Sequence, residues 1–237
     1  MKELFDEDLG RILVVVNARS RRIIGRRKSD YYQLTIPAGL SNKDILDAVS
    51  SMKGRLKSLK LKPTNSITDD TTFQTLTFKF EIQRTKGQNS YKISLKSNVI
   101  TINIPEKADI CSDKSQNIIK TLVRNSLRTE AKKVFPTKVK QLAERNNILY
   151  NSLKINSSVS RWGSCSMQKN INLSMFLLFL SEKYIDYVIL HELTHTIEMN
   201  HGANFWKLLS KYCGEDAKKL RKELRQSVPD AYYLIAE

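Results

Sequence analysis

All three histidines of this 237-residue chain, His191, His195 and His201, lie within a single window of eleven residues. His191 and His195 are four residues apart, so on a helix they would lie one turn apart on the same face. From that face both imidazoles could reach a single Zn²⁺ ion at about 2.0–2.1 Å. Because apolar residues at helical spacing precede the window, we predict a helix that is buried on one side and open to a cleft on the other.

The third histidine, His201, follows Asn200, which tolerates a left-handed turn, and precedes Gly202, which relaxes the backbone. Three protein ligands leave the fourth position of a zinc ion open to water, which is the arrangement of a catalytic site. Glu192 lies between the first two histidines, where it would act as a general base and take a proton from zinc-bound water. The window therefore predicts a zinc-dependent metallohydrolase.

Glu198 is an alternative ligand, because on a continued helix it would share a face with His191 and His195. We favour His201, since imidazole suits zinc well, and expect Glu198 to support the ligands. A structural zinc site would favour cysteine ligands, and no cysteine lies near the window. The spacing HExxHxxxxxH equals that of metzincins, but Glu198 stands where metzincins need a glycine, so the chain is not a metzincin.

The chain is strongly basic, with 40 Lys and Arg against 24 Asp and Glu and a formal net charge of +16. This charge predicts attraction to polyanions such as nucleic acid, nucleotides or acidic surfaces. Six basic residues without an acidic one among them lie between positions 19 and 28. That run is either a phosphate-binding patch or a solvated hairpin.

The cysteines, Cys111, Cys165 and Cys213, are odd in number and widely spaced, which favours reduced thiols in a cytosolic setting. The amino terminus carries no signal-peptide pattern. The longest apolar run, residues 175–180, is far too short to span a bilayer. We therefore expect a soluble, cytoplasmic protein without a membrane partner.

The hydrophobic pattern indicates a mixed α+β protein. We predict two strands at 12–16 and 31–36, a helix at 42–60 and a three-stranded meander at 73–104. A long helix at 115–147 should be kinked or divided by Pro136, and a short β-rich stretch should cover 153–173. Further helices follow: one from Ser181 through the histidine window, one from Asn204 and one at 217–226. No internal repeat is evident. We expect a basic, β-rich part with one helix at 1–112 and a second part, which holds the histidines, at 113–237.

Several short motifs in the second part resemble those of the YgjP-like metallopeptidases, which are related to the WLM and SprT-like zinc proteases. The motifs are 159–166 (VSRWGSCS), 170–173 (NINL), 186–195 (DYVILHELTH), 200–201 (NH) and 205–206 (FW). The specific match covers roughly residues 115–230, and the basic segment near the amino terminus is less distinctive. Thr194 and Thr196 stand where alanine and leucine are more usual in the family, and neither change threatens metal binding.

The resemblance implies a zincin-like catalytic domain with His191, His195 and His201 as zinc ligands and Glu192 as the general base. It also implies that residues 161–165 border the cleft, where an exposed strand edge could hold an extended peptide. Arg161 would then stabilise an anionic substrate group or the oxyanion, unless it forms a structural ion pair. We expect Trp162 to pack and Cys165 to be structural.

Three functions fit these observations. The first is a zinc metallopeptidase that cleaves a peptide or protein substrate, which we favour. The second is a phosphohydrolase or pyrophosphatase that acts on nucleoside triphosphates at the same metal site, with arginines in place of a Walker-type loop. The third is a DNA-associated protease that its basic amino-terminal part recruits to DNA.

Overall fold

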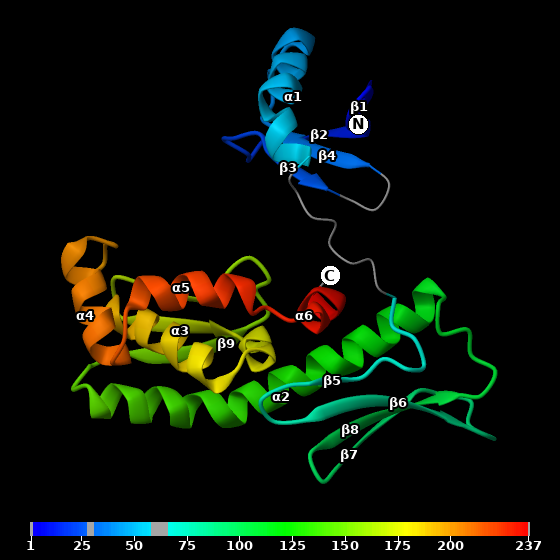
Figure 1. The fold of residues 1–237 in the computed structure, drawn as a ribbon. Coiled ribbons are helices and arrows are strands. Elements are labelled where there is room, and N and C mark those ends of the chain that lie inside the picture. Colours follow the sequence, from blue (N-terminus) through cyan, green and yellow to red (C-terminus); the bar gives the residue numbers. More distant parts are fainter. Residues whose placement is uncertain (1, 28–30, 58–65, 237) are drawn as a thin grey trace. The chain divides into compact units, whose positions relative to one another are not determined.

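The computed structural model describes residues 2–27, 31–57 and 66–236, which form two compact units, 1–65 and 66–237 (Figure 1). The sequence pattern predicted a domain boundary between residues 112 and 113. In the structure, the strands between residues 73 and 105 share one hydrophobic core with the histidine-bearing half, so they belong to the second unit. The composition of these strands resembles that of the amino-terminal strands, which is why the sequence pattern alone grouped them together. The predicted α+β class is confirmed.

The first unit is a mixed four-stranded sheet with one helix. Its elements are β1 (Lys2–Asp6), β2 (Gly10–Val16), β3 (Ile24–Arg27), β4 (Tyr32–Ile36) and α1 (Asn42–Lys57). The strand order is β1-β2-β4-β3, and β2 and β4 pair in parallel, so the segment between them is not a hairpin. A capping box starts α1: the amide of Ser41 donates to Asp44 Oδ2 at 2.8 Å, and the amide of Asp44 donates to Ser41 Oγ at 3.2 Å.

The second unit begins with another mixed sheet. Its strands are β5 (Phe73–Gln74), β6 (Lys79–Thr85), β7 (Lys92–Lys96) and β8 (Val99–Pro105), in the order β5-β6-β8-β7. The predicted meander is wrong, because β6 pairs in parallel with β8 and β7 lies at the edge. A tight turn with positive φ at Ser97 and Asn98 joins β7 to β8, which leaves the other side of β8 to β6. Alternation identifies strands, but it does not identify their neighbours.

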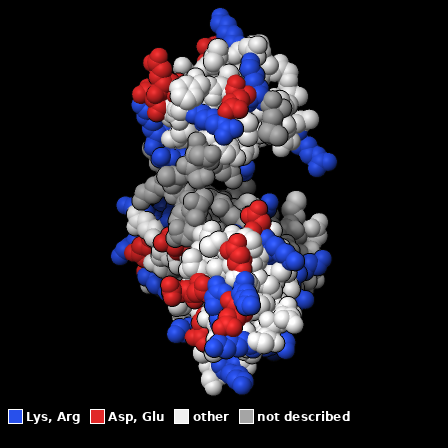
Figure 2. Space-filling view, turned by 90° about the vertical axis from the view of Figure 1, so that its right-hand side faces the viewer, with Lys and Arg blue, Asp and Glu red and all other residues white. Residues whose placement is uncertain are grey.

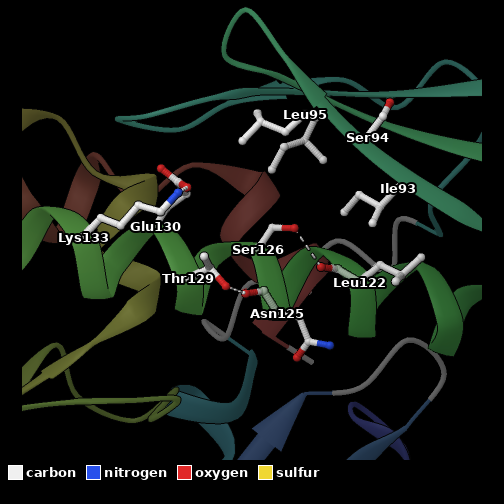
Figure 3. A pocket seen from close by; sticks show the side chains of 10 residues that line it. Ile93, Ser94, Leu95, Leu122, Asn125, Ser126, Thr129, Glu130 and Lys133 are labelled. Atoms are coloured by element: carbon white, nitrogen blue, oxygen red, sulfur yellow. Dashed lines mark hydrogen bonds and ion pairs between the residues drawn. The ribbon is translucent and has the colours of Figure 1, made fainter.

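Helix α2 (Asp113–Arg145) runs for 33 residues without a break at Pro136, so this proline does not divide the helix into two. Its buried residues recur every four positions from Ile119 to Ala143, so the apolar stripe winds slowly around the helix. The continuous burial offsets the helical hydrogen bond that Pro136 cannot make. Beside the sheet, a cavity of about 410 Å³ opens between β7 and α2, lined by Ile93, Leu95 and Leu122 among others (Figure 3).

The carboxy-terminal half of α2 packs against the last part of the chain, which contains the histidines and the elements around them (Figure 1). These elements are β9 (Ser152–Asn156), β10 (Gly163–Cys165), β11 (Asn170–Ser174), the 3₁₀ helix η1 (Met175–Phe179), α3 (Glu182–Thr194), α4 (Ala203–Cys213), α5 (Ala217–Gln226) and α6 (Asp230–Ala236). Their sheet has the order β10-β11-β9, so β10 is an edge strand. No helix among the described residues is long and apolar enough to cross a bilayer.

Candidate metal centre

Helix α3 positions His191 and Glu192 in its last turn. One side of the helix is fully apolar and buried, with Ile185, Ile189 and Leu193 at zero exposure, so the orientation of the helix is fixed by packing. The helix ends at Thr194, and its C-cap residue, His195, still has helical dihedrals (φ −64°, ψ −16°). The amide of His195 donates to His191 O at 3.3 Å, so the two imidazoles lie one turn apart, as the spacing predicted.

The chain then folds back and brings His201 to the other two histidines. The expected left-handed turn is absent: neither Asn200 nor Gly202 has a positive φ. Gly202 is instead extended (φ −76°, ψ −175°) and is the N-cap residue of α4. The reversal is made by a short turn after α3, in which Thr194 O accepts the amides of Ile197 and Glu198.

The three histidines converge. One imidazole nitrogen from each lies within 4.8 Å of the others, and Nε2 of His201 is 3.0 Å from Nε2 of His191. Three nitrogens bound to one zinc ion in tetrahedral geometry are about 3.3 Å apart, given Zn–N bonds of about 2.05 Å. The cluster is therefore close to the spacing that a single metal ion needs.

The protonation and hydrogen bonding of the imidazoles also fit a metal ion. His195 Nδ1 lies 3.1 Å from Glu198 O. If Nδ1 carries the proton and donates it to this carbonyl, Nε2 has a free lone pair for a metal ion. Burial lowers the pKa of all three histidines, that of His191 to about 3, so they are neutral at neutral pH. Neutral imidazole is the form that binds metal. Glu198 thus contributes its backbone carbonyl, and its carboxylate lies outside the cluster.

Two aromatic residues of α4 surround the cluster. The Phe205 ring is fully buried, and its centroid lies 4.9, 4.6 and 4.7 Å from those of His191, His195 and His201. The indole of Trp206 donates from Nε1 to His201 O at 3.1 Å and lies nearly parallel to the His201 ring. The sequence indicated both residues only as part of a family motif and predicted no contact between them and the histidines.

Glu192 is buried beside the edge strand β10, with an exposed fraction of 6%. This burial raises its pKa to about 8, and the charge of Arg161 opposes the rise. A Cβ atom at Gly163 would lie 2.7 Å from both Cγ and Oε1 of Glu192. Only glycine at this position lets the carboxylate approach the strand so closely. The requirement for glycine at 163 was not predicted, although the residue lies in the 159–166 motif.

The remaining predicted site residues lie in β10 or within two residues of it. Arg161 is exposed, forms no ion pair with a described residue and is close enough to Glu192 to lower its pKa. Trp162 packs on Tyr232 with ring centroids 4.9 Å apart, as expected of a packing residue. Cys165 is half-buried, and burial raises the pKa of its thiol to about 11.

Comparisons with known proteins found one family model and similar solved structures. The family model "YgjP-like, metallopeptidase domain" matches residues 21–227. The metallopeptidase zymogen jannalysin of Methanocaldococcus jannaschii is 23% identical, with a TM-score of 0.35 over 40% of this chain and 96% of that chain. The metallopeptidase zymogen abylysin of Pyrococcus abyssi is 21% identical, with a TM-score of 0.35 over 38% of this chain and 91% of that chain. No curated protein gives a match.

Proposed function

Since the chain belongs to the YgjP-like metallopeptidase family, we propose that it hydrolyses peptide bonds with a Zn²⁺ ion held by His191, His195 and His201. The convergence of the three imidazole nitrogens within 4.8 Å carries this proposal. A set of three neutral imidazoles, without a thiolate nearby, suits zinc and leaves one position for a ligand from solution. A bound zinc ion supplies Lewis acidity, which polarises a carbonyl and makes water acidic enough to lose a proton near neutral pH.

Glu192 is the residue that we assign as general base. A group with a pKa close to the working pH can both accept and return a proton, and the burial of Glu192 shifts its carboxyl group in that direction. In the proposed reaction, Glu192 takes the proton of the attacking water and passes it to the nitrogen of the departing amine. Gly163 keeps the space that this carboxylate occupies.

The substrate would lie along β10. This strand pairs with β11 on one side only, so its other edge can hydrogen-bond to the backbone of an extended peptide. Arg161 lies two residues before this strand and, lacking an ion pair with the described residues, is available to an anionic group of the substrate or the oxyanion. A peptide in this position would run past Glu192, because Gly163 is in the strand.

Replacement of Glu192 by glutamine tests the proposal. Glu192→Gln should abolish cleavage of an unfolded protein such as casein while the zinc content stays at one ion per chain. Glu198→Gln is the matched control, since its carboxylate lies outside the histidine cluster, and it should cut at the parental rate. Parental activity in Glu192→Gln would refute the role of this residue.

The same proteins should be tested on nucleoside triphosphates. Release of phosphate or pyrophosphate that depends on Glu192, without any peptide cleavage, would instead favour the phosphohydrolase. Zinc itself is tested by reloading metal-free protein with Zn²⁺, Mn²⁺ or Mg²⁺, of which the imidazole ligands should prefer Zn²⁺.

A further inference from the structure

The two mixed sheets have the same topology. In each, an outer antiparallel strand, a central parallel pair and a second antiparallel outer strand follow in the same order, and a helix comes next. The strand registers also agree: adding 68 to the residue numbers of a β2–β4 or β3–β4 pair in the first sheet gives a pair in the second sheet. Ile12 pairs with Tyr32 and Phe80 with Ile100, while Ile24 pairs with Thr35 and Lys92 with Asn103.

The chain therefore contains one module twice: a first module at residues 2–57 and a second module at residues 73–145. Both end their last strand at an Ile-Pro pair, residues 36–37 and 104–105, and both start their helix after a serine. No repeat was evident from the sequence, because few residues are identical and only the strand pairing exposes the equivalence. The register offset of 68 holds on both sides of the connection between the second and third strands, so its residues can be compared one by one.

At five positions, that comparison shows an arginine in the first module and a neutral residue in the second, although the second module has Lys86, Lys92 and Lys96 in the same segment. Five of the 14 arginines of the chain lie in the first module within nine residues: Arg19, Arg21, Arg22, Arg26 and Arg27. The positions 68 residues later in the second module hold Gly87, Asn89, Ser90, Ser94 and Leu95. Since the second module adopts the same fold with five neutral residues, the fold does not require the arginines.

The arginines lie on the segment that joins β2 to β3 and on β3 itself, which is an edge strand. Arg19, Arg21, Arg22 and Arg26 are exposed and form no ion pair with any residue that the structure describes. Arg27 is half-buried, with its guanidinium 5.6 Å from the centre of the Tyr32 ring. Five like charges in nine residues create a positive local potential, which attracts a ligand of opposite charge.

One face of the first sheet is not covered by α1. Gly25 faces the helix, where an added Cβ would contact Leu56, so its neighbour Arg26 points to the uncovered face. Phe5 opposes Arg11, which points the same way because its neighbour Ile12 is buried against α1. Phe5 is 82% exposed.

The first module also differs from the second in how this phenylalanine is placed. The counterpart of Phe5 is Phe73, which opposes Phe80 and stacks on its ring with the centroids 4.5 Å apart. The pairing of β5 with β6 is shifted by one residue relative to the pairing of β1 with β2. A shift of one residue moves a side chain to the opposite face of a sheet. The first module thus presents an exposed aromatic ring on the same face as Arg11 and Arg26.

We propose that the first module binds single-stranded nucleic acid through this arginine surface, defined as Arg19, Arg21, Arg22, Arg26 and Arg27, with Phe5 as a stacking platform for a base. Single strands are bound by cationic side chains that follow the phosphates and by aromatic rings that stack the bases. Five of the six basic residues between positions 19 and 28 are arginines, although the chain has 26 lysines and 14 arginines, and the guanidinium group pairs with phosphate through two parallel hydrogen bonds. On the face shown in Figure 2, basic side chains lie among acidic ones in both parts of the view. Binding at this surface would not depend on peptidase activity.

The test uses the second module as its template. In the full chain, Arg19→Gly, Arg21→Asn, Arg22→Ser, Arg26→Ser and Arg27→Leu are made together, so that each position receives the residue of its counterpart. The control variant loses the same charge elsewhere, with glutamine at five exposed lysines of the second unit: Lys86, Lys92, Lys96, Lys107 and Lys114. Binding of a fluorescent 30-nucleotide single-stranded DNA and RNA is measured by anisotropy between 50 and 300 mM NaCl.

We expect the arginine variant to bind at least tenfold more weakly than the parent and the lysine control to bind within threefold of it. The slope of log K against log salt should decrease by about 3.5 in the arginine variant, since each lost phosphate contact of a single strand contributes about 0.7. Phe5→Ala should weaken binding of the single strand by about tenfold but leave binding of a duplex of the same length unchanged.

Equal losses in the two charge variants would overturn the proposal, as would the absence of binding by the parent at 50 mM salt. Binding of the parent to phosphatidylglycerol vesicles that the oligonucleotide does not displace would assign the surface to membranes instead, and would also overturn it. If the arginine variant does not fold, photo-crosslinking of the parent to the oligonucleotide decides: crosslinks within residues 2–27 support the proposal, and crosslinks only elsewhere refute it.

Discussion

Replacing Gly163 with alanine tests whether the position of the Glu192 carboxylate sets the rate of hydrolysis. The added Cβ would lie 2.7 Å from Cγ and Oε1 of Glu192. Non-bonded carbon atoms rest at about 3.5 Å, so the carboxylate or β10 must move by about 0.8 Å. Displacements of about 1 Å in a catalytic group cost up to about 100-fold in rate. We expect kcat/KM to fall about 10- to 100-fold, which corresponds to about 1.4–2.7 kcal/mol of transition-state stabilisation.

The metal should stay bound in Gly163→Ala, because the nearest neighbours of the added atom all belong to Glu192. The assay is steady-state cleavage of a fluorogenic peptide, together with the zinc content and the free energy of unfolding of each variant. Overpacking of this kind destabilises a fold by about 1–3 kcal/mol, so rates are compared at a temperature where both proteins are folded.

Gly202→Ala is the matched control for Gly163→Ala. Gly202 directly follows His201, but a Cβ atom there would meet nothing within 4 Å, and its φ of −76° suits any residue. In a Glu192→Ala background, the alanine at position 163 should cause no further loss, since the two residues act through one contact. Parental kcat/KM in a folded, zinc-loaded Gly163→Ala protein would refute the reasoning, and so would an equal loss in Gly202→Ala.

Three further outcomes are expected. Removal of metal with a chelator should abolish peptide cleavage and lower the melting temperature, and added Zn²⁺ should restore both, as activity and differential scanning fluorimetry would show. Trp206→Phe removes the hydrogen bond to the backbone of His201 and should weaken zinc affinity by about tenfold, measured by competition with a chromophoric chelator. Burial raises the thiol pKa of Cys165 to about 11 and of Cys213 to about 12, so both stay protonated at pH 8. The exposed Cys111 should therefore react with a disulfide reagent first, and two equally fast thiols would contradict this order.

Features that depend on neighbours in the sequence could be predicted. The spacing of His191 and His195 and the apolar run before them indicated a helix with both imidazoles on one face, and α3 has this geometry. Ser41 and Asp44 indicated the start of α1, which a capping box stabilises. In these cases the residues that determine the structure lie within about one helical turn of each other, so a local pattern contains the necessary information.

Features that depend on distant residues could not be predicted in the same way. Phe205 contacts all three histidines only because α4 folds back on α3, and Gly163 is required only because β10 passes beside Glu192. Most apolar residues at helical spacing simply pack in a core, and most glycines at a bend serve the turn, so neither pattern indicates a site by itself. Strand neighbours present the same difficulty, since the alternation of β6 and β8 fits parallel and antiparallel pairing equally well.

The two modules differ in the length of their helices, and only the second shares a core with the histidine cluster. In the first module, α1 has 16 residues and buries only Ile45, Val49 and Leu56, which is enough to cover one small sheet. In the second, α2 has 33 residues, and its additional turns pack against α3 and β9. The longer helix thus links the second module to the histidine-bearing elements through one core, while the first module forms a compact unit of its own.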